Sequence, residues 1–435
     1  MNAFDLLKKK IKNKKAVIGI IGLGYVGLPL ANLFTKKNFK VVGVDIDEKR
    51  IASLIGKKSY ITDIKNDELK KMSARSKFVP TSDFSILKKS DVIIICVPTP
   101  LRKTQEPDIS YIVKAAKEIA RIRPIGKLII LESTTYPGTT DEVVLPILEK
   151  TGLKLDRDFF LVFSPERVDP SNRKYKTENI TKLVGGVTKK SAFLAKNIYG
   201  KIIGKVIVVS SSRVAETAKL LENTFRTVNI ALVNEISMVC KALKIDVWDV
   251  IAAAKTKPFG FMPFYPGPGI GGHCLTTDPI YLGWKAILHG FKSEFIELAQ
   301  KINSSMPHYV YKMIETALNK KIKGAKIFVL GVAYKKDVND IRESPALDLI
   351  KILKKNGAKV YYSDPFVPYV FINGDKIFSC SINDKVLKMS DCVVITTEHS
   401  AFDYRKICRI ARMIIDTRGI TKQINNLSDN KIIRI

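Results

Sequence analysis

The segment AVIGIIGLGYVGLPLA, residues 16–31, constrains the fold of this chain more than any other stretch. A short apolar run leads into Gly22, Gly24 and Gly27, which have the spacing G-x-G-x-x-G, and a helix-like stretch follows them. Glycines so placed let the chain turn tightly, let backbone N–H groups approach a pyrophosphate and let the helix pack on the strand. The alternative is a turn of a sheet that holds no ligand.

Asp45 favours the ligand-binding interpretation. It ends the next strand-like run, KVVGVD at residues 40–45. A carboxylate at that position bonds the ribose hydroxyls of adenosine and repels a 2′-phosphate. The sequence therefore predicts NAD, rather than NADP, as the cofactor.

Short β-branched runs alternate with amphipathic stretches through the first 210 residues. The strand-like runs lie at 16–21, 40–45, 91–96, 127–133, 159–164, 181–186 and 205–210. Such alternation predicts a parallel sheet with helices on both faces. A second βαβ unit begins at 325–334, and its helix is expected over 344–357. We expect an α/β chain with two Rossmann-like doubly wound domains.

The middle of the chain has a different pattern. Apolar residues recur every three or four positions over 213–245, which predicts one long helix that bridges domains or forms an oligomer seam. We expect a domain at 1–210, a central helical domain at 211–319 and a last domain at 320–435. Glu216, Lys219 and Asn223 share a face of the long helix, which is either solvated or turned to a cleft.

The Gly/Pro-rich segment YPGPGIGGHCLTTDP, residues 265–279, is expected to be a loop that presents Cys274. Its glycines free the backbone to lie against a ligand, and its prolines limit its motion. A buried structural cysteine is the alternative. A dinucleotide site with a nucleophilic thiol favours oxidation of an alcohol to a carboxylate, with two NAD reduced and a thioester as intermediate.

Composition excludes some classes of protein. The formal net charge of +31 is compatible with a nucleic acid partner, but the lysines are spread along the whole chain. We therefore expect an anionic small-molecule substrate and no nucleic acid. The six cysteines include no C-x-x-C pair, so we expect neither a zinc ribbon nor another metal site. Their low number in a long chain indicates a reducing, cytoplasmic environment. We expect no membrane span.

Several motifs in this order resemble the nucleotide-sugar 6-dehydrogenase family: GLGYVGLPLA, VPTP, SPERVDP, AKLLENTFRTVNIALVNEI, GPGIGGHCLTTDP and AYKKDVNDIRESPALDL. The resemblance implies that the first domain binds NAD, the last binds the nucleotide of a UDP-sugar, and the long helix makes a homodimer. It implies oxidation of the sugar C6 hydroxymethyl group. GGHC at residues 271–274 resembles the branch acting on UDP-N-acetylhexosamines, above all UDP-N-acetylglucosamine, whereas LTT at 275–277 departs from that branch.

The resemblance also implies roles for single residues. Cys274 is the nucleophile, Lys219 and Asn223 lie near the C6 oxygen, and Asp278 works with Lys219 through water. Glu166 is the base in thioester hydrolysis, and Thr134 orients the water. Further NAD contacts are implied at Tyr25, Val26, Arg50, Thr99, Thr134 and Arg342. Further substrate contacts are implied at Glu166, Arg167, Tyr265, Gly271, Lys335 and Arg418.

Two other functions remain open at this point. UDP-glucose 6-dehydrogenase is the near alternative, since the choice of sugar depends on resemblance alone. A basic NAD-binding protein that acts on nucleic acid is the distant one, and it would bind DNA with a steep dependence on salt.

Overall fold

The structure is a computed structural model that describes residues 2–61, 64–74, 77–168, 175, 177–319, 322–424 and 431–435. The chain forms two compact units. The first comprises Met1–Glu222 and Ile280–Gly290, and the second comprises Asn223–Pro279 and Phe291–Ile435. Asp169 and Pro170, the end of the SPERVDP motif, lie outside the described residues.

The first unit is built on an eight-stranded sheet in the order β3-β2-β1-β4-β5-β6-β7-β8. Its strands are β1 (Val17–Ile21), β2 (Lys40–Val44), β3 (Phe78–Thr81), β4 (Val92–Ile95), β5 (Lys127–Leu131), β6 (Phe159–Phe163), β7 (Lys182–Gly186) and β8 (Val206–Val209). The order of the first six is that of a dinucleotide-binding sheet. The seven predicted strands are confirmed, while the edge strand β3, which contains Pro80, was not predicted.

The prediction of an all-parallel sheet is wrong at one place. β7 runs antiparallel to β6, whereas the other neighbours are parallel. A parallel connection needs a crossover that normally contains a helix. The described residues between Phe163 and Lys182 contain no helix, so the chain returns in the opposite direction.

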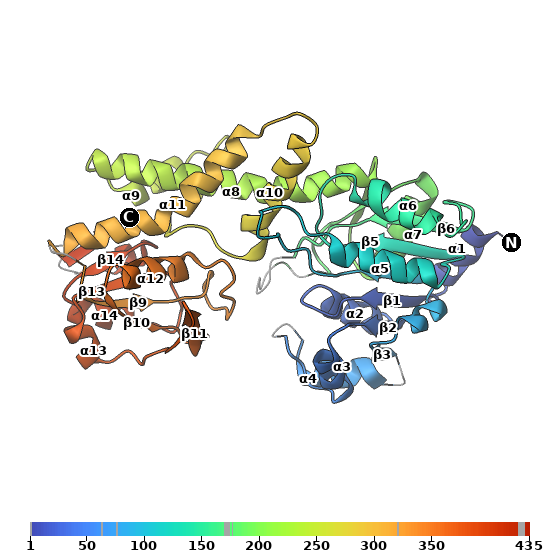
Figure 1. Ribbon diagram of the computed structural model, residues 1–435, viewed down its shortest axis with the longest axis horizontal. Helices are drawn as coiled ribbons and strands as arrows, with labels where there is room; N and C mark the ends of the chain where they lie inside the picture. The colour runs from blue at the N-terminus through green and yellow to red at the C-terminus, as the bar shows by residue number, and fades with distance from the viewer. Residues whose placement is uncertain are drawn as a thin grey trace. The chain divides into compact units, whose positions relative to one another are not determined.

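Helices cover both faces of this sheet, as Figure 1 shows. One face packs against α1 (Ala3–Lys12), α2 (Gly27–Lys36), α3 (Glu48–Ile55), α4 (Asn66–Ser73) and α7 (Lys189–Tyr199). The other face packs against η2 (Phe84–Lys89), α5 (Ser110–Arg121), η3 (Thr139–Val144) and α6 (Leu145–Glu149). Alternate residues of one strand enter the two cores, as Ile94 and Ile95 of β4 do.

The helices of the middle segment are α8 (Ser212–Ala242), α9 (Val247–Ala254), α10 (His273–Ile287) and α11 (Glu294–Ala317). The predicted long helix is confirmed. It ends three residues early because Lys244 adopts a left-handed conformation (φ 58°) and the N–H of Ile245 closes back on the carbonyl of Cys240. None of the helices of the described residues is both long and apolar enough to cross a membrane.

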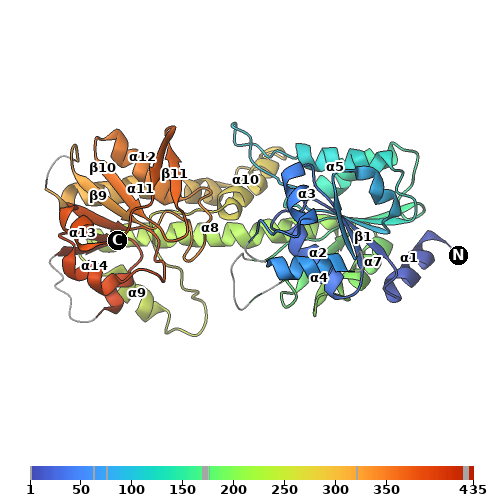
Figure 2. The same cartoon turned by 90° about the horizontal axis from the view of Figure 1, so that it is seen from below.

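The second unit contains a five-stranded parallel sheet in the order β10-β9-β13-β14-β15. Its strands are β9 (Lys326–Leu330), β10 (Lys359–Ser363), β13 (Cys392–Ile395), β14 (Ile414–Asp416) and β15 (Ile432–Arg434), and β11 (Tyr369–Ile372) pairs with β12 (Asp375–Phe378) as a hairpin. α11 and α12 (Pro345–Lys355) pack on one face of the five-stranded sheet, and α13 (Asp384–Met389), α14 (Tyr404–Ile410) and η4 (Ile420–Gln423) pack on the other (Figure 2). The predicted fold class is confirmed.

Candidate active site

The loop after β1 has the geometry of a pyrophosphate cradle. Gly22 has φ 90°, and a Cβ there would overlap the backbone carbonyl of Cys96 after β4. A Cβ on Gly27 would overlap the carbonyl oxygen of Gly22, so α2 could not pack on β1. Gly24 has open space where its Cβ would be, which leaves room for a ligand against the backbone. The loop therefore fits a dinucleotide.

Asp45 fixes this loop. Its side chain is buried, Oδ2 accepts from the N–H of Leu23 (2.8 Å), and Oδ1 accepts from the N–H of Asp47 (3.0 Å). Arg50 lies 3.4 Å from the same carboxylate and over the ring of Tyr60. The predicted Asp45 and Arg50 are thus together at the end of β2. Of the other predicted NAD contacts, Tyr25 is exposed and Val26 stands at the N-cap position of α2 without a side-chain capping bond. Thr99 is buried, and its carbonyl accepts from Tyr281 (3.0 Å).

Glu166 lies three residues after β6, where its carboxylate is held by the protein. Oε1 accepts from the N–H groups of Arg167 and Val168, both at 2.8 Å, and Oε2 lies 3.5 Å from Nζ of Lys182. Burial alone would raise the pKa of Glu166, but Lys182, the two N–H groups and Lys219 together lower it below its usual value. Arg167 pairs with Glu222 of α8 (2.5 Å). Thr134, after β5, is half-buried.

The polar face of α8 is buried, so its interpretation as a solvated face is wrong. Glu216 is fully buried, and Lys219 and Asn223 are 8% and 6% exposed. Glu216 accepts from the N–H groups of Gly138 (2.7 Å) and Thr140 (3.0 Å). Glu216 therefore satisfies two backbone N–H groups at the start of η3, and Glu142 pairs with Lys285 and Arg213.

Cys274 lies in the first turn of α10, not in a loop as predicted. Gly272 (φ 81°) ends the loop and the helix begins at His273, so the predicted loop is shorter than expected. Pro279 inside the helix cannot donate to the carbonyl of Leu275, and Thr227 of α8 donates to that carbonyl instead (2.9 Å). This contact lets the helix continue through a proline.

Cys274 is the one exposed thiol of the six cysteines. The positive end of the 15-residue α10 favours negative charge at its sulfur. Asp278 lies one turn further on the same face and accepts from Nδ2 of Asn223 (2.5 Å). Burial and the nearby Arg342 lower the pKa of His273, which favours a neutral imidazole.

The two glycines just before α10 lie close to other parts of the protein. A Cβ on Gly271 would approach Tyr334 and Glu343, and a Cβ on Gly272 would meet the ring of Tyr334. Both glycines are buried, so they permit close packing in addition to any contact with a ligand. Tyr265, in the same loop, is partly exposed and stacks on Trp248 at 6.0 Å between ring centroids.

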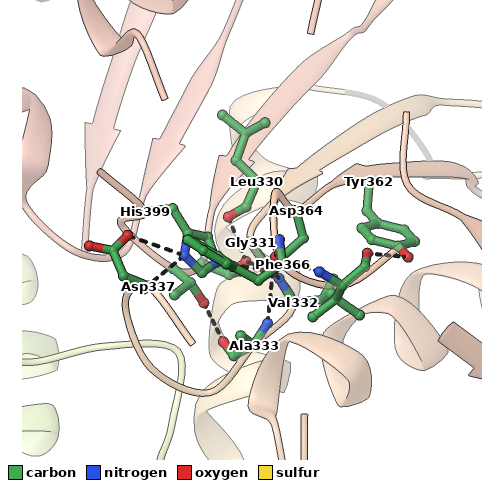
Figure 3. Close-up of polar contacts among 12 residues, drawn as sticks. Leu330, Gly331, Val332, Ala333, Asp337, Tyr362, Asp364, Phe366 and His399 are labelled. Carbon is green, nitrogen blue, oxygen red and sulfur yellow. Dashed lines mark hydrogen bonds and ion pairs between the residues drawn. The ribbon is translucent and has the colours of Figure 1, made fainter. Parts of the chain in front are cut away.

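The last sheet repeats the arrangement of the first. Gly331 after β9 has φ 85°, and its N–H donates to the carbonyl of Ser363, just as that of Gly22 donates to Val44. Asp364 after β10 accepts from the N–H groups of Val332 (2.7 Å) and Ala333 (3.0 Å), as Asp45 accepts from Leu23. Figure 3 shows this cluster.

His399 joins Asp364 to the loop that carries Lys335. Its Nε2 lies 3.0 Å from Asp364, its Nδ1 accepts from the N–H of Asp337 (3.0 Å), and it is fully buried (Figure 3). Arg418, another predicted substrate contact, forms a two-pronged ion pair with Glu398 (2.6 and 3.1 Å). Arg342 pairs with Asp340 (2.6 Å).

The structure thus gathers Cys274, Asp278 and Asn223 in the second unit, and Gly22, Gly24, Gly27, Asp45 and Arg50 in the first. Glu132, Lys182, Asp364 and His399 were not predicted, and Glu216 was predicted only as part of the polar face of the long helix. A strand ending in aspartate, YYSD like VVGVD, is the signal that could have identified Asp364. In the part of the chain that the structure describes, no three His, Cys, Asp or Glu side chains gather as metal ligands.

Comparison with known proteins identifies the class of protein that this fold and cradle define. Three models of the UDP-glucose/GDP-mannose dehydrogenase family match the chain: the NAD binding domain at residues 16–203, the central domain at 213–305 and the UDP binding domain at 328–423. The chain belongs to this family. It is an oxidoreductase, and its cofactor is NAD.

Individual relatives cover nearly the whole chain. It is 36% identical over 395 residues to the UDP-N-acetyl-D-glucosamine 6-dehydrogenase of Pseudomonas aeruginosa, with 90% of this chain and 89% of that one aligned. It is 36% identical over 417 residues to the UDP-N-acetyl-D-mannosamine dehydrogenase of Pyrococcus horikoshii, with 93% and 96% aligned. The solved structure of UDP-D-ManNAc dehydrogenase from Pyrococcus horikoshii matches at a TM-score of 0.87 and 34% identity, covering 96% of this chain and 99% of that one.

Proposed function

We propose that this enzyme oxidises the C6 hydroxymethyl group of UDP-N-acetylglucosamine to the uronic acid. The observation that carries the proposal is the exposed Cys274 at the start of α10, one turn before an Asp278 that Asn223 holds. An alcohol dehydrogenase that stops at the aldehyde has no use for a presented thiol. An oxidation that continues to the acid needs one.

The residues suit the steps of such a reaction. NAD, when bound, takes up one hydride in each of two oxidations. Between the two oxidations, the thiolate of Cys274 adds to the aldehyde carbon and gives a thiohemiacetal, which the second oxidation converts to a thioester. Water then attacks the thioester carbonyl, a proton passes to Glu166, and the Cys274 thiolate leaves. The sum consumes one alcohol, one water and two NAD, and it yields one carboxylate, two NADH and three protons.

Lys219 and Asn223 are proposed to bind the C6 oxygen. An ammonium stabilises an alkoxide or oxyanion best where water is excluded, and both side chains are buried on one face of α8. Thr134 is proposed to orient the attacking water. Lys335, Arg418, Arg167, Tyr265 and Gly271 are proposed to bind the UDP-sugar, and Arg342 to reach NAD.

The assignment of the sugar depends on the names of the relatives and on one motif of this sequence. Relatives with similar identity are named for UDP-N-acetyl-D-glucosamine and for UDP-N-acetyl-D-mannosamine, and both names favour an N-acetylhexosamine over glucose. We place UDP-N-acetylglucosamine first because of GGHC at residues 271–274. The homodimer through α8, the three-part domain division and the cytoplasmic location stay predictions.

A substrate panel tests this function. The enzyme is incubated with NAD and, separately, UDP-N-acetylglucosamine, UDP-N-acetylmannosamine, UDP-glucose and GDP-mannose, and NADH is followed by absorbance. The highest kcat/KM is expected for UDP-N-acetylglucosamine. A higher value for UDP-N-acetylmannosamine or UDP-glucose would change the assigned sugar, and no NADH with any of the four would contradict the function.

A further inference from the structure

Glu166 belongs to a buried cluster of charged side chains. Cys96, Glu132 and Glu166 follow the carboxyl ends of β4, β5 and β6. Because β7 is antiparallel to β6, its first residue, Lys182, comes to this same edge of the sheet. The register pairs Val162 with Gly186 and Phe163 with Gly185, and its continuation puts Glu166 opposite Lys182.

Lys182 is held between the two carboxylates. Its side chain is 4% exposed, and Nζ lies 2.9 Å from Oε1 of Glu132 and 3.5 Å from Oε2 of Glu166. The ammonium also lies over the ring of Tyr199, 5.1 Å from its centroid. Tyr199 is fully buried and donates its hydroxyl to the same oxygen of Glu132. The lysine therefore has little freedom to leave this position.

One ammonium shared by two carboxylates leaves an excess negative charge in a buried site, which is costly unless one carboxylate takes up a proton. The surroundings of the two carboxylates differ. Burial raises the pKa of Glu132, against the effect of Lys182. Oε2 of Glu132 has no hydrogen-bond partner among the described residues. Glu166, by contrast, accepts two N–H bonds that favour its charged form.

The other groups around Glu166 do not replace Lys182. Arg167 is engaged by Glu222 and by the carbonyl of Thr181. Lys219 on α8 adds positive charge, but it has a smaller effect on the pKa of Glu166 than Lys182 has. Among the described residues, the remaining titratable neighbours are the thiol of Cys96, whose pKa burial raises, and the phenol of Tyr199, whose pKa burial also raises.

We propose that Lys182 is a positioning residue that keeps Glu166 ionised and oriented as the base of thioester hydrolysis. Glu132 is the neutral anchor of Lys182, that is, a protonated carboxyl group that holds the ammonium in place. This inference rests on the proposed function. Glu166 accepts the proton of the attacking water, while Lys182 and Glu132 act only through it. Without Lys182, Glu166 would hold its proton up to a higher pH, and in that pH range the thioester on Cys274 would persist.

The test removes the positive charge of Lys182 and keeps a side chain of similar length. Lys182→Met is expected to move the acidic limb of the kcat profile upward by about one to three pH units, because an ammonium at this distance lowers a carboxyl pKa by about that much. At pH values below the shifted limb, kcat should fall at least tenfold with little change in KM. Rapid mixing should show a burst of two NADH per site before a slow phase, and Lys182→Arg should restore the wild-type profile.

Lys127→Met is a matched control. Lys127 is also a buried lysine at the start of a strand of this sheet, but it donates to the carbonyls of Lys88 and Ser90. Its replacement should lower the Tm and leave the pH profile and the burst unchanged. If Lys182→Met does not fold, Glu132→Gln decides: a neutral anchor requires the acidic limb to stay in place, and a shift of one pH unit or more contradicts the inference.

Two different results separate an error in the role of Lys182 from an error in the function of the enzyme. An active wild-type enzyme with a folded Lys182→Met variant that keeps the wild-type pH profile and shows no burst overturns the role of Lys182 alone. A wild-type enzyme that makes no NADH with any UDP-sugar overturns the proposed function and this inference with it.

Discussion

Asn223 donates its Nδ2 to Oδ2 of Asp278 at 2.5 Å, and this buried hydrogen bond joins α8 to the helical face that carries Cys274. Cys274 and Asp278 are four residues, or about one helical turn, apart on α10. A contact that fixes the Asp278 carboxylate therefore also fixes the orientation of the helical turn that carries the thiol. The geometry of the proposed reaction therefore depends on a contact between two side chains that the sequence separates widely.

Removing this contact should affect stability and activity together. Asn223→Leu takes a donor from a buried carboxylate, and hydrogen bonds to charged groups are worth about 1.5–3 kcal/mol. The free energy of unfolding should fall by about that amount, and kcat should fall at least tenfold. Urea unfolding and steady-state kinetics measure the two quantities. Asn229→Leu is the control and should change neither, because Asn229 is half-buried on α8 and its Nδ2 donates to the carbonyl of Phe225 in the same helix.

Thr227 should be needed for the start of α10. Thr227→Val removes the hydroxyl that serves the Leu275 carbonyl, which Pro279 cannot serve, at an expected cost of about 1–3 kcal/mol for an unsatisfied buried acceptor. Thr217→Val makes the same change on the same helix, where the hydroxyl only bonds back to its own helix at Arg213. Urea unfolding of both variants checks the prediction, and equal stability of the two contradicts it.

Asp364 should make stability depend on acid pH. Burial alone would raise its pKa, but His399 and backbone N–H groups lower it. A lowered pKa in the folded state contributes stability that is present above the unfolded pKa of about 3.9 and is lost as pH falls through the folded pKa. Asp364→Asn should cost about 1.5–3 kcal/mol at pH 7 and less at pH 3.

The control for Asp364 is Asp384→Asn, whose carboxylate is exposed and pairs with Lys406. Unfolding by urea at a series of pH values should give this variant the wild-type curve. The same loss of stability at pH 3 and pH 7 for Asp364→Asn would contradict the assignment of an ionised carboxylate.

Asp45 should set the preference for NAD over NADP. Asp45→Asn keeps an oxygen to accept from Leu23 but removes the negative charge that repels a 2′-phosphate. The ratio of kcat/KM for NAD to that for NADP should fall at least tenfold, mainly through KM. A ratio that matches the wild-type value would show that the carboxylate does not face the ribose.

The strands and the long helix could be predicted because their signals are local. β-branched runs such as Val92–Ile95 and the apolar repeat of α8 depend on the periodicity of the element alone. The start of α10 was missed because Gly272 and Pro279 are local breaking signals, and the compensating hydroxyl of Thr227 comes from elsewhere in the chain. The direction of β7 depends on the connection before it, which periodicity does not reveal.

Part of the candidate site could not be predicted for the same reason. The cradle glycines and Asp45 form a motif with fixed spacing, whereas Lys182 and Glu132 meet only after the sheet forms. The buried state of Glu216, Lys219 and Asn223 depends on what covers α8, and their spacing is equally compatible with a solvated face.

The ratio of NADH formed to UDP-N-acetylglucosamine consumed decides whether Cys274 carries the oxidation through to the acid, with wild-type enzyme and Cys274→Ala measured side by side and the product identified by mass. We expect two NADH and one carboxylic acid per sugar for the wild-type enzyme, and no acid above background for the variant. One NADH per sugar with release of an aldehyde by the wild-type enzyme, or normal acid formation by Cys274→Ala, would contradict this expectation.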